Sequence, residues 1–386
     1  MPAWIHRIET SLPDFSFSQE EAMIKMQEWA RDDRERRLIR AVYRNSGIDR
    51  RHSVLRNFDG QGGEDAFFLR AQDGTFKGPG TAARNDIFAV ESRAISVALA
   101  RKIIGNCPGI GPGDVTHVVT VSCTGFYNPG PDYYIVRELG LSDATQRYHL
   151  GFMGCYAAFP ALRMASQFCE ADPRAVVLVM CLELCSIHMQ LTGTEDSLLA
   201  NSLFADGAGA AIVSGREPTP GDSSCRIEGF RSALVPSGEQ EMTWRIGDQG
   251  FDIVLSSYVP KLIGANIQAM VLPALATVGL SPEDIDTWAV HPGGKAIIDQ
   301  VQKSLGLSPE RVRASREVLR SCGNMSSASI LFVLEEILRI PSEAVPERIC
   351  AIAFGPGLTV ELATLAAIPA ASGAGVATVP AGGRPG

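Results

Sequence analysis

The chain has 386 residues, of which 45% are hydrophobic and 20% are charged, and its formal net charge at pH 7 is −8. This composition excludes a disordered chain, and the acidic balance argues against a general nucleic-acid-binding protein, which needs a concentrated basic face. A chain of this length predicts either two units or one large α/β unit with a sizeable core.

The first half begins with a segment that has no export signal. Its first residues, MPAWIHRIETSLPDF, lack the basic and apolar stretches of a signal peptide, and no apolar run approaches a membrane-spanning length. Residues 18–40 are mostly helix formers and predict an exposed helical segment with a capped start. The polar, Gly-rich residues 59–84 predict a loop. Residues 86–104 predict a helix from their apolar spacing, and the β-branched residues 117–121 predict a strand that ends in Ser-Cys-Thr-Gly.

The second half repeats this order. Residues 266–278 predict an apolar helix, the segment SPEDID predicts a turn, and residues 287–290 predict a strand that ends in His-Pro-Gly-Gly. One further buried strand is predicted in each half, over residues 175–179 and residues 349–354. The repeated order predicts an internal duplication.

Alternating strands and helices predict an α/β fold with right-handed crossovers and helices on both sheet faces. We place the two halves at residues 1–225 and 226–369. The Gly-, Ala- and Pro-rich tail, residues 370–386, is predicted to be disordered.

The nine cysteines indicate neither a disulfide framework nor a zinc site. Their number is odd, and none belongs to a Cys-x-x-Cys pair. We therefore expect a cytoplasmic protein without a bound metal.

Three separated segments carry residues with catalytic potential. A Gly-rich turn delivers Cys155 into a run of helix formers, and a helix N-terminus favours the nucleophilic thiolate. His291 ends a predicted strand immediately before Pro-Gly-Gly, where α/β sheets place their chemistry. Asn324 precedes a strongly apolar helix. Each residue also has a structural interpretation, as a buried thiol, a core histidine and a helix N-cap respectively.

The motifs in these segments resemble those of a known family. GFMGCYAAFPALR, WAVHPGG, CGNMSSASILFVLE and FGPGLTVE stand in the order and at about the spacing seen in thiolase-fold condensing enzymes. The FGPG loop, with LFADGAGAAIV and NPGPDYYIVRELGL, resembles type III polyketide synthases in particular. The resemblance covers residues 1–369 and implies a thiolase-like fold, a duplicated five-layer αβαβα architecture. It also implies a homodimer, in which the segment around Asn128 crosses to the partner subunit.

The resemblance implies a mechanism without a cofactor, with an acyl-CoA starter and malonyl-CoA as substrates. Cys155 takes the starter acyl group as a thioester and pairs with His291 as an ion pair. His291 and Asn324 donate hydrogen bonds to the malonyl thioester oxygen, so that decarboxylation yields a stabilised enolate. Repeated extension and cyclisation give an aromatic ring of the resorcinol or phloroglucinol type, or a pyrone.

The substrate pocket and the CoA contacts are also implied by the resemblance. Phe204 matches the gatekeeper phenylalanine, whereas Ile253 replaces a second, aromatic gatekeeper of the plant enzymes. Cys123, Cys185 and His188 stand where the plant enzymes have small hydroxyl residues, so a starter other than the plant type is expected, with a fatty acyl chain as the hypothesis. The other predicted pocket residues are Thr124, Ser326, Phe354, Gly355, Pro356 and Gly357. The predicted CoA contacts are Gly293, Gly294 and Ala296.

Two alternatives remain at this stage. A ketoacyl-acyl carrier protein synthase III shares the fold and the Cys/His/Asn trio, but condenses once and takes its extender from a carrier protein. A non-condensing thioester hydrolase or an acyl-binding protein is more remote. A hydroxymethylglutaryl-CoA synthase needs a carboxylate base near the thiol, and the sequence does not reveal one.

Overall fold

The computed structural model describes residues 2–57, 66–70, 76–218, 223–339 and 347–368. The strands are β1 (Ala3–Ser11), β2 (Ser16–Ser18), β3 (Arg50–His52), β4 (Leu69–Arg70), β5 (Phe76–Lys77), β6 (His117–Ser122), β7 (Gln146–Gly151), β8 (Val176–Leu184), β9 (Asp206–Ser214), β10 (Ser224–Leu234), β11 (Met242–Gly247), β12 (Gly250–Leu255), β13 (Thr287–Val290), β14 (Arg348–Gly355) and β15 (Thr359–Ile368). The helices are α1 (Gln19–Trp29), α2 (Asp33–Arg44), α3 (Thr81–Gly105), α4 (Pro131–Leu139), α5 (Ala158–Ala171), α6 (Glu195–Leu203), α7 (Val259–Ala276), α8 (Lys295–Leu305), α9 (Arg313–Cys322) and α10 (Ser329–Leu338).

A nine-stranded sheet with the order β13-β14-β15-β10-β1-β9-β8-β6-β7 runs through both halves of the chain. In the first half, β6 is parallel to β8, which is antiparallel to β9, which is antiparallel to β1. In the second half, β13, β14, β15 and β10 repeat this pattern of directions. The pairing is the one expected of a duplicated unit. The boundary placed between residues 225 and 226 falls inside β10.

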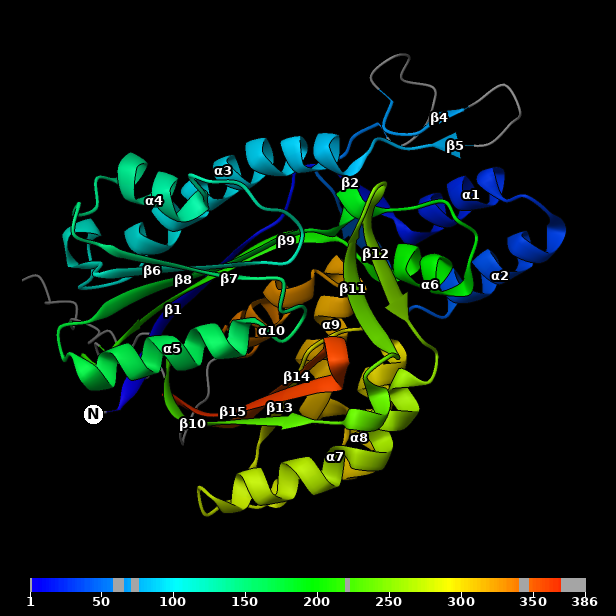
Figure 1. Cartoon of the computed structure of the whole chain (residues 1–386). Coiled ribbons are helices and arrows are strands. Elements are labelled where there is room, and N and C mark those ends of the chain that lie inside the picture. Colours follow the sequence, from blue (N-terminus) through cyan, green and yellow to red (C-terminus); the bar gives the residue numbers. More distant parts are fainter. Residues whose placement is uncertain (1, 58–65, 71–75, 219–222, 340–346, 369–386) are drawn as a thin grey trace, which may run out of the picture.

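The helices and strands form five layers, as Figure 1 shows. α3 covers the outer face of the strands of the first half and contacts β1, β8 and β9. α5 and α10 lie in the middle layer, where α5 contacts β6, β8 and β9 on one side and β10 and β15 on the other. α7 contacts β10 and β15 and forms the opposite outer layer with α8. The thiolase-like fold predicted from the motifs is therefore confirmed.

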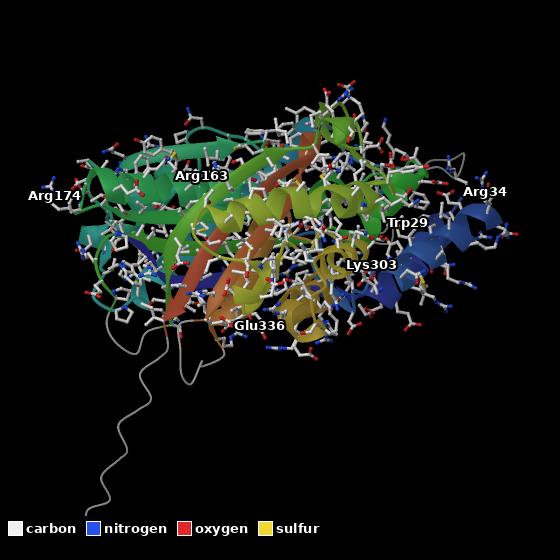
Figure 2. The ribbon with its side chains drawn as sticks, turned by 90° about the horizontal axis from the view of Figure 1, so that it is seen from below. Trp29, Arg34, Arg163, Arg174, Lys303 and Glu336 are labelled. Atoms are coloured by element: carbon white, nitrogen blue, oxygen red, sulfur yellow. The ribbon has the colours of Figure 1, made fainter. Side chains whose placement is uncertain are left out.

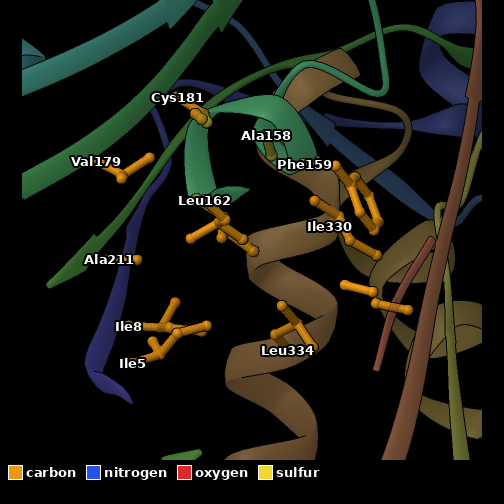
Figure 3. Packing of buried hydrophobic residues seen from close by; sticks show 14 of the residues in the cluster. Ile5, Ile8, Ala158, Phe159, Leu162, Val179, Cys181, Ala211, Ile330 and Leu334 are labelled. Atoms are coloured by element: carbon orange, nitrogen blue, oxygen red, sulfur yellow. The ribbon is translucent and has the colours of Figure 1, made fainter. Parts of the chain in front are cut away.

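The middle layer encloses the largest part of the core because both of its helices are apolar around much of their circumference. Phe159 and Leu162 of α5 face Ile330 and Leu334 of α10 in one buried cluster, which Ile8 of β1 joins (Figure 3). All of these side chains are at most 5% exposed. A helix that is buried on both sides needs this composition, which explains the long apolar runs that follow Cys155 and Asn324 in the sequence.

The N-terminal helical segment differs from its prediction in two respects. It consists of two helices, because Asp32 caps a new helix by accepting a hydrogen bond from the backbone N–H of Glu35 at 2.8 Å. It is also not simply exposed, since Met23, Met26 and other apolar side chains form a small core with α6. Seen from below, Arg34 of α2 lies at one end of the molecule and Arg174 lies at the other (Figure 2).

Other predicted elements shift at their ends. α3 begins at Thr81, within the stretch predicted as a loop. This start was missed because the first turn of the helix carries no apolar periodicity. Residues 59–65 and 71–75 of that stretch lie outside the described residues, as does the predicted disordered tail. The strand predicted over residues 287–290 is confirmed as β13.

The helix α7 corrects the expectation that no segment approaches a membrane-spanning length. Over Val259–Ala276 it is long and apolar enough to cross a membrane by length and composition alone. Its buried residues, among them Ile263, Ile267 and Val271, pack in the core of the second half. One face of the helix therefore packs on the core, as expected of a helix in the outer layer of an α/β fold.

Candidate active site

A tight turn places Cys155 next to the Gly-Pro-Gly loop that follows β14. Gly154 has a left-handed φ of +85°, and a Cβ at this position would lie 2.3 Å from Pro356 Cδ. A Cβ on Gly355 would lie 2.5 Å from the Tyr156 ring. Only glycines allow these two loops to pack this closely. α5 begins at Ala158, so the thiol lies just before the helix rather than in its first turn.

His291 and Asn324 reach the same place from the second half. His291 follows β13, and its backbone N–H donates to the Ile352 carbonyl at 2.8 Å, which extends the pairing with β14. Asn324 is not the N-cap of α10, which is Ala328. Its side-chain Oδ1 accepts from the backbone N–H of Ser326 at 2.9 Å, and its Nδ2 donates to the Gly293 carbonyl at 3.3 Å. These two bonds fix the amide so that its N–H₂ group lies on the side of the His291 loop.

A small cavity of about 40 Å³ brings most of the predicted residues together. The predicted residues that line it are Cys123, Thr124, Cys155, Cys185, Phe204, Ile253, His291, Gly293, Asn324, Ser326, Phe354 and Pro356. Met242, Thr243, Trp244, Leu255 and Ile297 also line it and were not predicted. We call this space the catalytic pocket.

The resting site holds neutral groups. Burial raises the pKa of the Cys155 thiol to about 12, and burial lowers the pKa of His291 to about 3. Cys155 keeps some exposed surface because it faces the pocket, although protein atoms surround it closely. Within the described part of the chain, neither ring nitrogen of His291 has a hydrogen-bond partner. The His291 ring forms no hydrogen bond with Cys155 in this structure, so the ion pair expected between these residues stays a prediction.

A buried carboxyl group that the sequence analysis missed lies behind the catalytic pocket. Glu183 is fully buried in β8 and accepts hydrogen bonds from the backbone N–H of Cys123 at 3.0 Å and from the Thr124 hydroxyl at 2.9 Å. Ser327 also donates to it. Burial raises the pKa of Glu183 despite these donors. The one available signal was a carboxylate inside an otherwise apolar strand.

A chain of polar contacts joins this carboxyl group to Cys155, the predicted nucleophile. The Ser326 hydroxyl lies 3.5 Å from Cys155 Sγ and 3.3 Å from Cys123 Sγ. Cys123 Sγ in turn lies 3.4 Å from both carboxyl oxygens of Glu183. Glu183 therefore does not contact Cys155 directly, and none of the described residues places a carboxylate against this thiol.

His188 is held as a neutral, immobile ring. Its Nε2 hydrogen-bonds the Thr124 carbonyl at 2.7 Å, and its Nδ1 accepts from the backbone N–H of Phe251 at 3.1 Å. These partners assign the proton to Nε2, and burial lowers the pKa of His188 to about 4. The ring stacks on Phe251 with a centroid distance of 3.9 Å. It is a fixed part of the wall and has no nitrogen left for substrate.

A much larger cavity, of about 660 Å³, lies on the other side of Phe204 and Ile253. Both residues line this cavity and the catalytic pocket, as do Cys185 and Trp244. Its further walls come from α1, α6 and β12, and residues such as Phe15, Phe17, Met26, Trp29 and His188 line it. At its outer end, Ile24 is 50% exposed. We call this space the outer cavity.

The three predicted CoA contacts do not lie in one place. Gly293 lines the catalytic pocket, Gly294 is the N-cap of α8, and Ala296 is exposed in the first turn of that helix. Gly294 and Ala296 line neither cavity, and the same holds for Gly355 and Gly357 of the Gly-Pro-Gly loop. Gly357 has a left-handed φ of +71°, which accounts for this glycine by backbone conformation alone.

Comparison with known families decides which condensing enzyme this architecture represents. A model of the N-terminal domain of chalcone and stilbene synthases matches residues 71–218, and a model of their C-terminal domain matches residues 228–369. The chain belongs to the chalcone and stilbene synthase family. This assignment makes it an acyltransferase related to the type III polyketide synthases.

Solved structures agree with the family over nearly the whole chain. The type III domain of Steely1, a type I/III hybrid from Dictyostelium, has 27% identity and a TM-score of 0.86, covering 95% of this chain and 100% of that domain. PKS-I from the brown alga Ectocarpus siliculosus has 28% identity and a TM-score of 0.86, covering 95% and 98%. The 1,3,6,8-tetrahydroxynaphthalene synthase from Streptomyces coelicolor has 27% identity and a TM-score of 0.81, covering 94% and 99%.

One curated relative is far longer than this family member. "Probable polyketide synthase 1" of Dictyostelium discoideum is 35% identical over 259 residues, which are 64% of this chain. The match covers only 8% of the length of that relative.

Proposed function

We propose that this protein is a type III polyketide synthase that loads an acyl-CoA starter on Cys155, extends it with malonyl-CoA and cyclises the product. One observation carries the proposal: a thiol, an imidazole and a carboxamide from three distant segments line the same small pocket. The two nitrogens of His291 have no partner among the residues that the structure describes, so they are available to a substrate.

Loading transfers the acyl group from CoA to the enzyme. Cys155 Sγ attacks the starter thioester carbonyl, the bond to the CoA sulfur breaks, and CoA leaves with the proton. His291 accepts the thiol proton when the two side chains meet across the pocket. This contact supplies the partner that both buried groups lack, and a thiolate is the nucleophilic form of cysteine.

Extension uses the same pocket for a second thioester. Malonyl-CoA loses CO₂, and the electron pair of the broken bond becomes an enolate on the remaining acetyl group. His291 and the Asn324 amide donate to its oxygen. The enolate carbon attacks the Cys155 thioester, a carbon-carbon bond forms, and the sulfur leaves as thiolate. The Ser326 N–H and the Gly293 carbonyl hold the amide in orientation, so its donors need no reorganisation.

The space around the nucleophile supports a starter with a long apolar chain. The catalytic pocket, at about 40 Å³, holds little beyond the reacting atoms, whereas the outer cavity offers about 660 Å³ directly beyond Ile253. That volume lies within the range of roughly 300–1,000 Å³ typical of small-molecule sites. An aliphatic side chain in place of an aromatic one leaves a wider opening between the two spaces. A fatty acyl starter, cyclised to a resorcinol, a phloroglucinol or a pyrone, is the form of the proposal that we favour.

The test supplies purified protein with malonyl-CoA and a series of aliphatic and aromatic acyl-CoAs, without a carrier protein. Intact-protein mass should increase by one acyl group, the Cys155→Ala variant should show no increase, and products with several malonyl-derived units should appear by liquid chromatography and mass spectrometry. An absolute requirement for a carrier protein and a single extension would support the ketoacyl-acyl carrier protein synthase III alternative. Thioester hydrolysis without condensation would support the hydrolase.

The same experiment decides the starter class. Products from aliphatic starters support the outer cavity as the site of the acyl chain. If an aromatic acyl-CoA reacts and every aliphatic one fails, the fatty acyl hypothesis is wrong. The Ile253→Phe variant should reduce the rate with long-chain starters more than the rate with acetyl-CoA, because it narrows the boundary.

We further propose a cytoplasmic homodimer. The apolar side chains of Val90, 69% exposed, and Phe126, 37% exposed, support a partner surface near Asn128. Hydrogen bonds between Asn85 and Phe126 join the two elements that carry these side chains. Sedimentation of the purified protein at the mass of one chain would contradict the dimer.

A further inference from the structure

A buried arginine in the wall of the outer cavity has no carboxylate within ion-pair distance among the described residues. Arg51 of β3 is 5% exposed, and no described acidic side chain lies within ion-pair distance of it. Its Nε donates to Gln19 Oε1 at 2.9 Å, and its Nη1 donates to the carbonyls of Asn201 at 2.7 Å and Phe204 at 2.8 Å. A buried cation without a counterion is costly unless other groups compensate it, so the arrangement calls for an explanation.

The guanidinium lies over the rings of Phe17 and Tyr43, at 5.1 and 5.7 Å, and is attracted by the buried Asp206; the remaining compensation comes from the C-terminus of α6. The last carbonyls of a helix have no partner inside the helix and carry its negative dipole end. Besides Arg51, the Gln19 amide donates to the Ser202 carbonyl at 2.7 Å, and the Tyr43 hydroxyl donates to the Asn201 carbonyl at 3.0 Å. Three side chains from the N-terminal segment therefore bind the C-terminal end of α6. Phe204, which lies between the two cavities, is the C-cap residue of this helix.

The held segment is bonded directly to the backbone of the predicted catalytic amide. The backbone N–H of Asn324 donates to the Leu203 carbonyl at 2.9 Å, and the N–H of Ala205 donates to the Asn324 carbonyl at 2.8 Å. Residues 204 and 324 thus form an isolated parallel bridge. Asn324 depends on the end of α6 for its position, since no named strand contains it.

Arg51 also contacts the residue before Asn324 from the other side. A Cβ built on Gly323 would lie 2.9 Å from Arg51 Cγ and 3.1 Å from the Leu203 carbonyl oxygen. The aliphatic part of Arg51 therefore packs against the Gly323 backbone while its guanidinium holds the Phe204 carbonyl. One side chain fixes both strands of the short bridge.

From these contacts we infer that Arg51 is a positioning residue for Asn324 and Phe204, and that it acts on the decarboxylation step more than on the loading of Cys155. The inference rests on the proposed function, in which Asn324 binds the enolate oxygen and Cys155 alone bonds to the starter. Cys155 lies on the turn before α5 and bonds neither residue of this bridge; its contact is with the Ser326 hydroxyl, one residue removed from Asn324 in the hydrogen-bond chain. A small displacement of a positioned donor costs up to about 100-fold in rate.

The experiment measures two half-reactions separately in the Arg51→Met variant. The variant keeps the aliphatic stem and removes the guanidinium. Decarboxylation of malonyl-CoA to acetyl-CoA should fall by about 10- to 100-fold, while acylation of Cys155 by an accepted starter, followed by intact mass, should fall by less than about threefold.

The matched control is Arg84→Met. Arg84 is also a buried arginine that donates to backbone carbonyls, at Pro79, Ile187 and Met189, and it does not contact the bridge at Asn324. Its loss should lower both half-reactions by a similar factor. An equal loss of both half-reactions in Arg51→Met would overturn the inference, because it would indicate a general structural role.

Two further outcomes keep the inference separable from the proposed function. If the wild-type protein loads a starter but does not decarboxylate malonyl-CoA, the proposed function is wrong. If Arg51→Met does not fold, Arg51→Lys replaces it, since an ammonium group keeps the charge but lacks the planar fork that reaches three acceptors. This variant should shift the ratio of the two half-reactions in the same direction, and an unchanged ratio would contradict the inference.

Discussion

Replacing His291 by glutamine tests whether the buried imidazole activates the nucleophile. Burial raises the pKa of the Cys155 thiol to about 12, so a thiol without a partner is ionised to only ~10⁻⁵ at pH 7. A thiol paired with an imidazole is substantially ionised at that pH. The variant His291→Gln keeps a polar side chain of similar size but cannot accept and hold the thiol proton as a cation.

The expected change in rate is smaller than the change in ionisation. A shift of about five pKa units alters the thiolate fraction by ~10⁵, but a thiolate of high pKa is intrinsically more nucleophilic, with a Brønsted slope of about 0.4–0.5. The two effects together predict that alkylation of Cys155 slows by roughly 10²- to 10³-fold in His291→Gln. In the variant the alkylation rate should also rise about tenfold per pH unit between pH 7 and 9, because this pH range lies well below the pKa of the thiol.

Alkylation by iodoacetamide, followed by intact-protein mass between pH 6 and 9, measures this directly. Cys155→Ala identifies the signal that belongs to the nucleophile, since the other eight thiols are buried. Asn324→Ala serves as the matched control, because it opens the same pocket without removing a base, and its alkylation rate should stay close to that of the wild-type protein. Equal rates in the wild-type protein and in His291→Gln would refute the ion-pair reasoning.

Two other predictions concern the walls of the catalytic pocket. Glu183→Leu leaves the N–H of Cys123 and the hydroxyl of Thr124 without their acceptor, so the free energy of unfolding in urea should fall by about 3 kcal/mol or more. Glu183→Gln retains one acceptor, so its free energy of unfolding should fall by only about 1 kcal/mol. A leucine variant as stable as the wild type would contradict the assigned hydrogen bonds. Trp244→Ala removes a ring that lines both cavities and donates a hydrogen bond to the Cys123 carbonyl at 2.8 Å. The products formed from one starter, identified by mass spectrometry, should therefore shift toward longer chains. An unchanged product distribution would show that this ring does not limit extension.

The elements that carry Cys155 and His291 could be predicted because their signals are local. A glycine turn before a run of helix formers and an apolar run before Pro-Gly-Gly are complete within about ten residues each. The repeated order of strands likewise follows from periodicity. The break between α1 and α2 was missed because helix formers continue through it, and only the capping bond at Asp32 ends one helix and starts the next.

The support around the trio could not be predicted, since it depends on contacts between distant segments. Glu183 meets Ser327 across 144 residues, and Arg51 meets Phe204 across 153 residues. Neither sequence neighbourhood indicates a partner, because a carboxylate in a strand and an arginine near a helix are both common on surfaces. The N-cap interpretation of Asn324 could not be rejected from the sequence for the same reason, since only the folded chain shows that Ala328 is the N-cap of α10.

The burial that keeps the resting site neutral also makes it suited to an enolate. Hydrogen-bond donors aimed at a developing negative charge are most effective where water is excluded and where they need not turn away from other partners. His291 satisfies both conditions, because it is 1% exposed and neither of its nitrogens is engaged. Its two expected roles then follow in sequence: contact with Cys155 supplies the missing partner during loading, and once the sulfur is acylated the same imidazole is free for the oxygen of the extender. A variant whose Cys155 is alkylated as fast as in the wild type, but which does not decarboxylate malonyl-CoA, would separate activation of the thiol from decarboxylation. Asn324→Ala is the change expected to produce it.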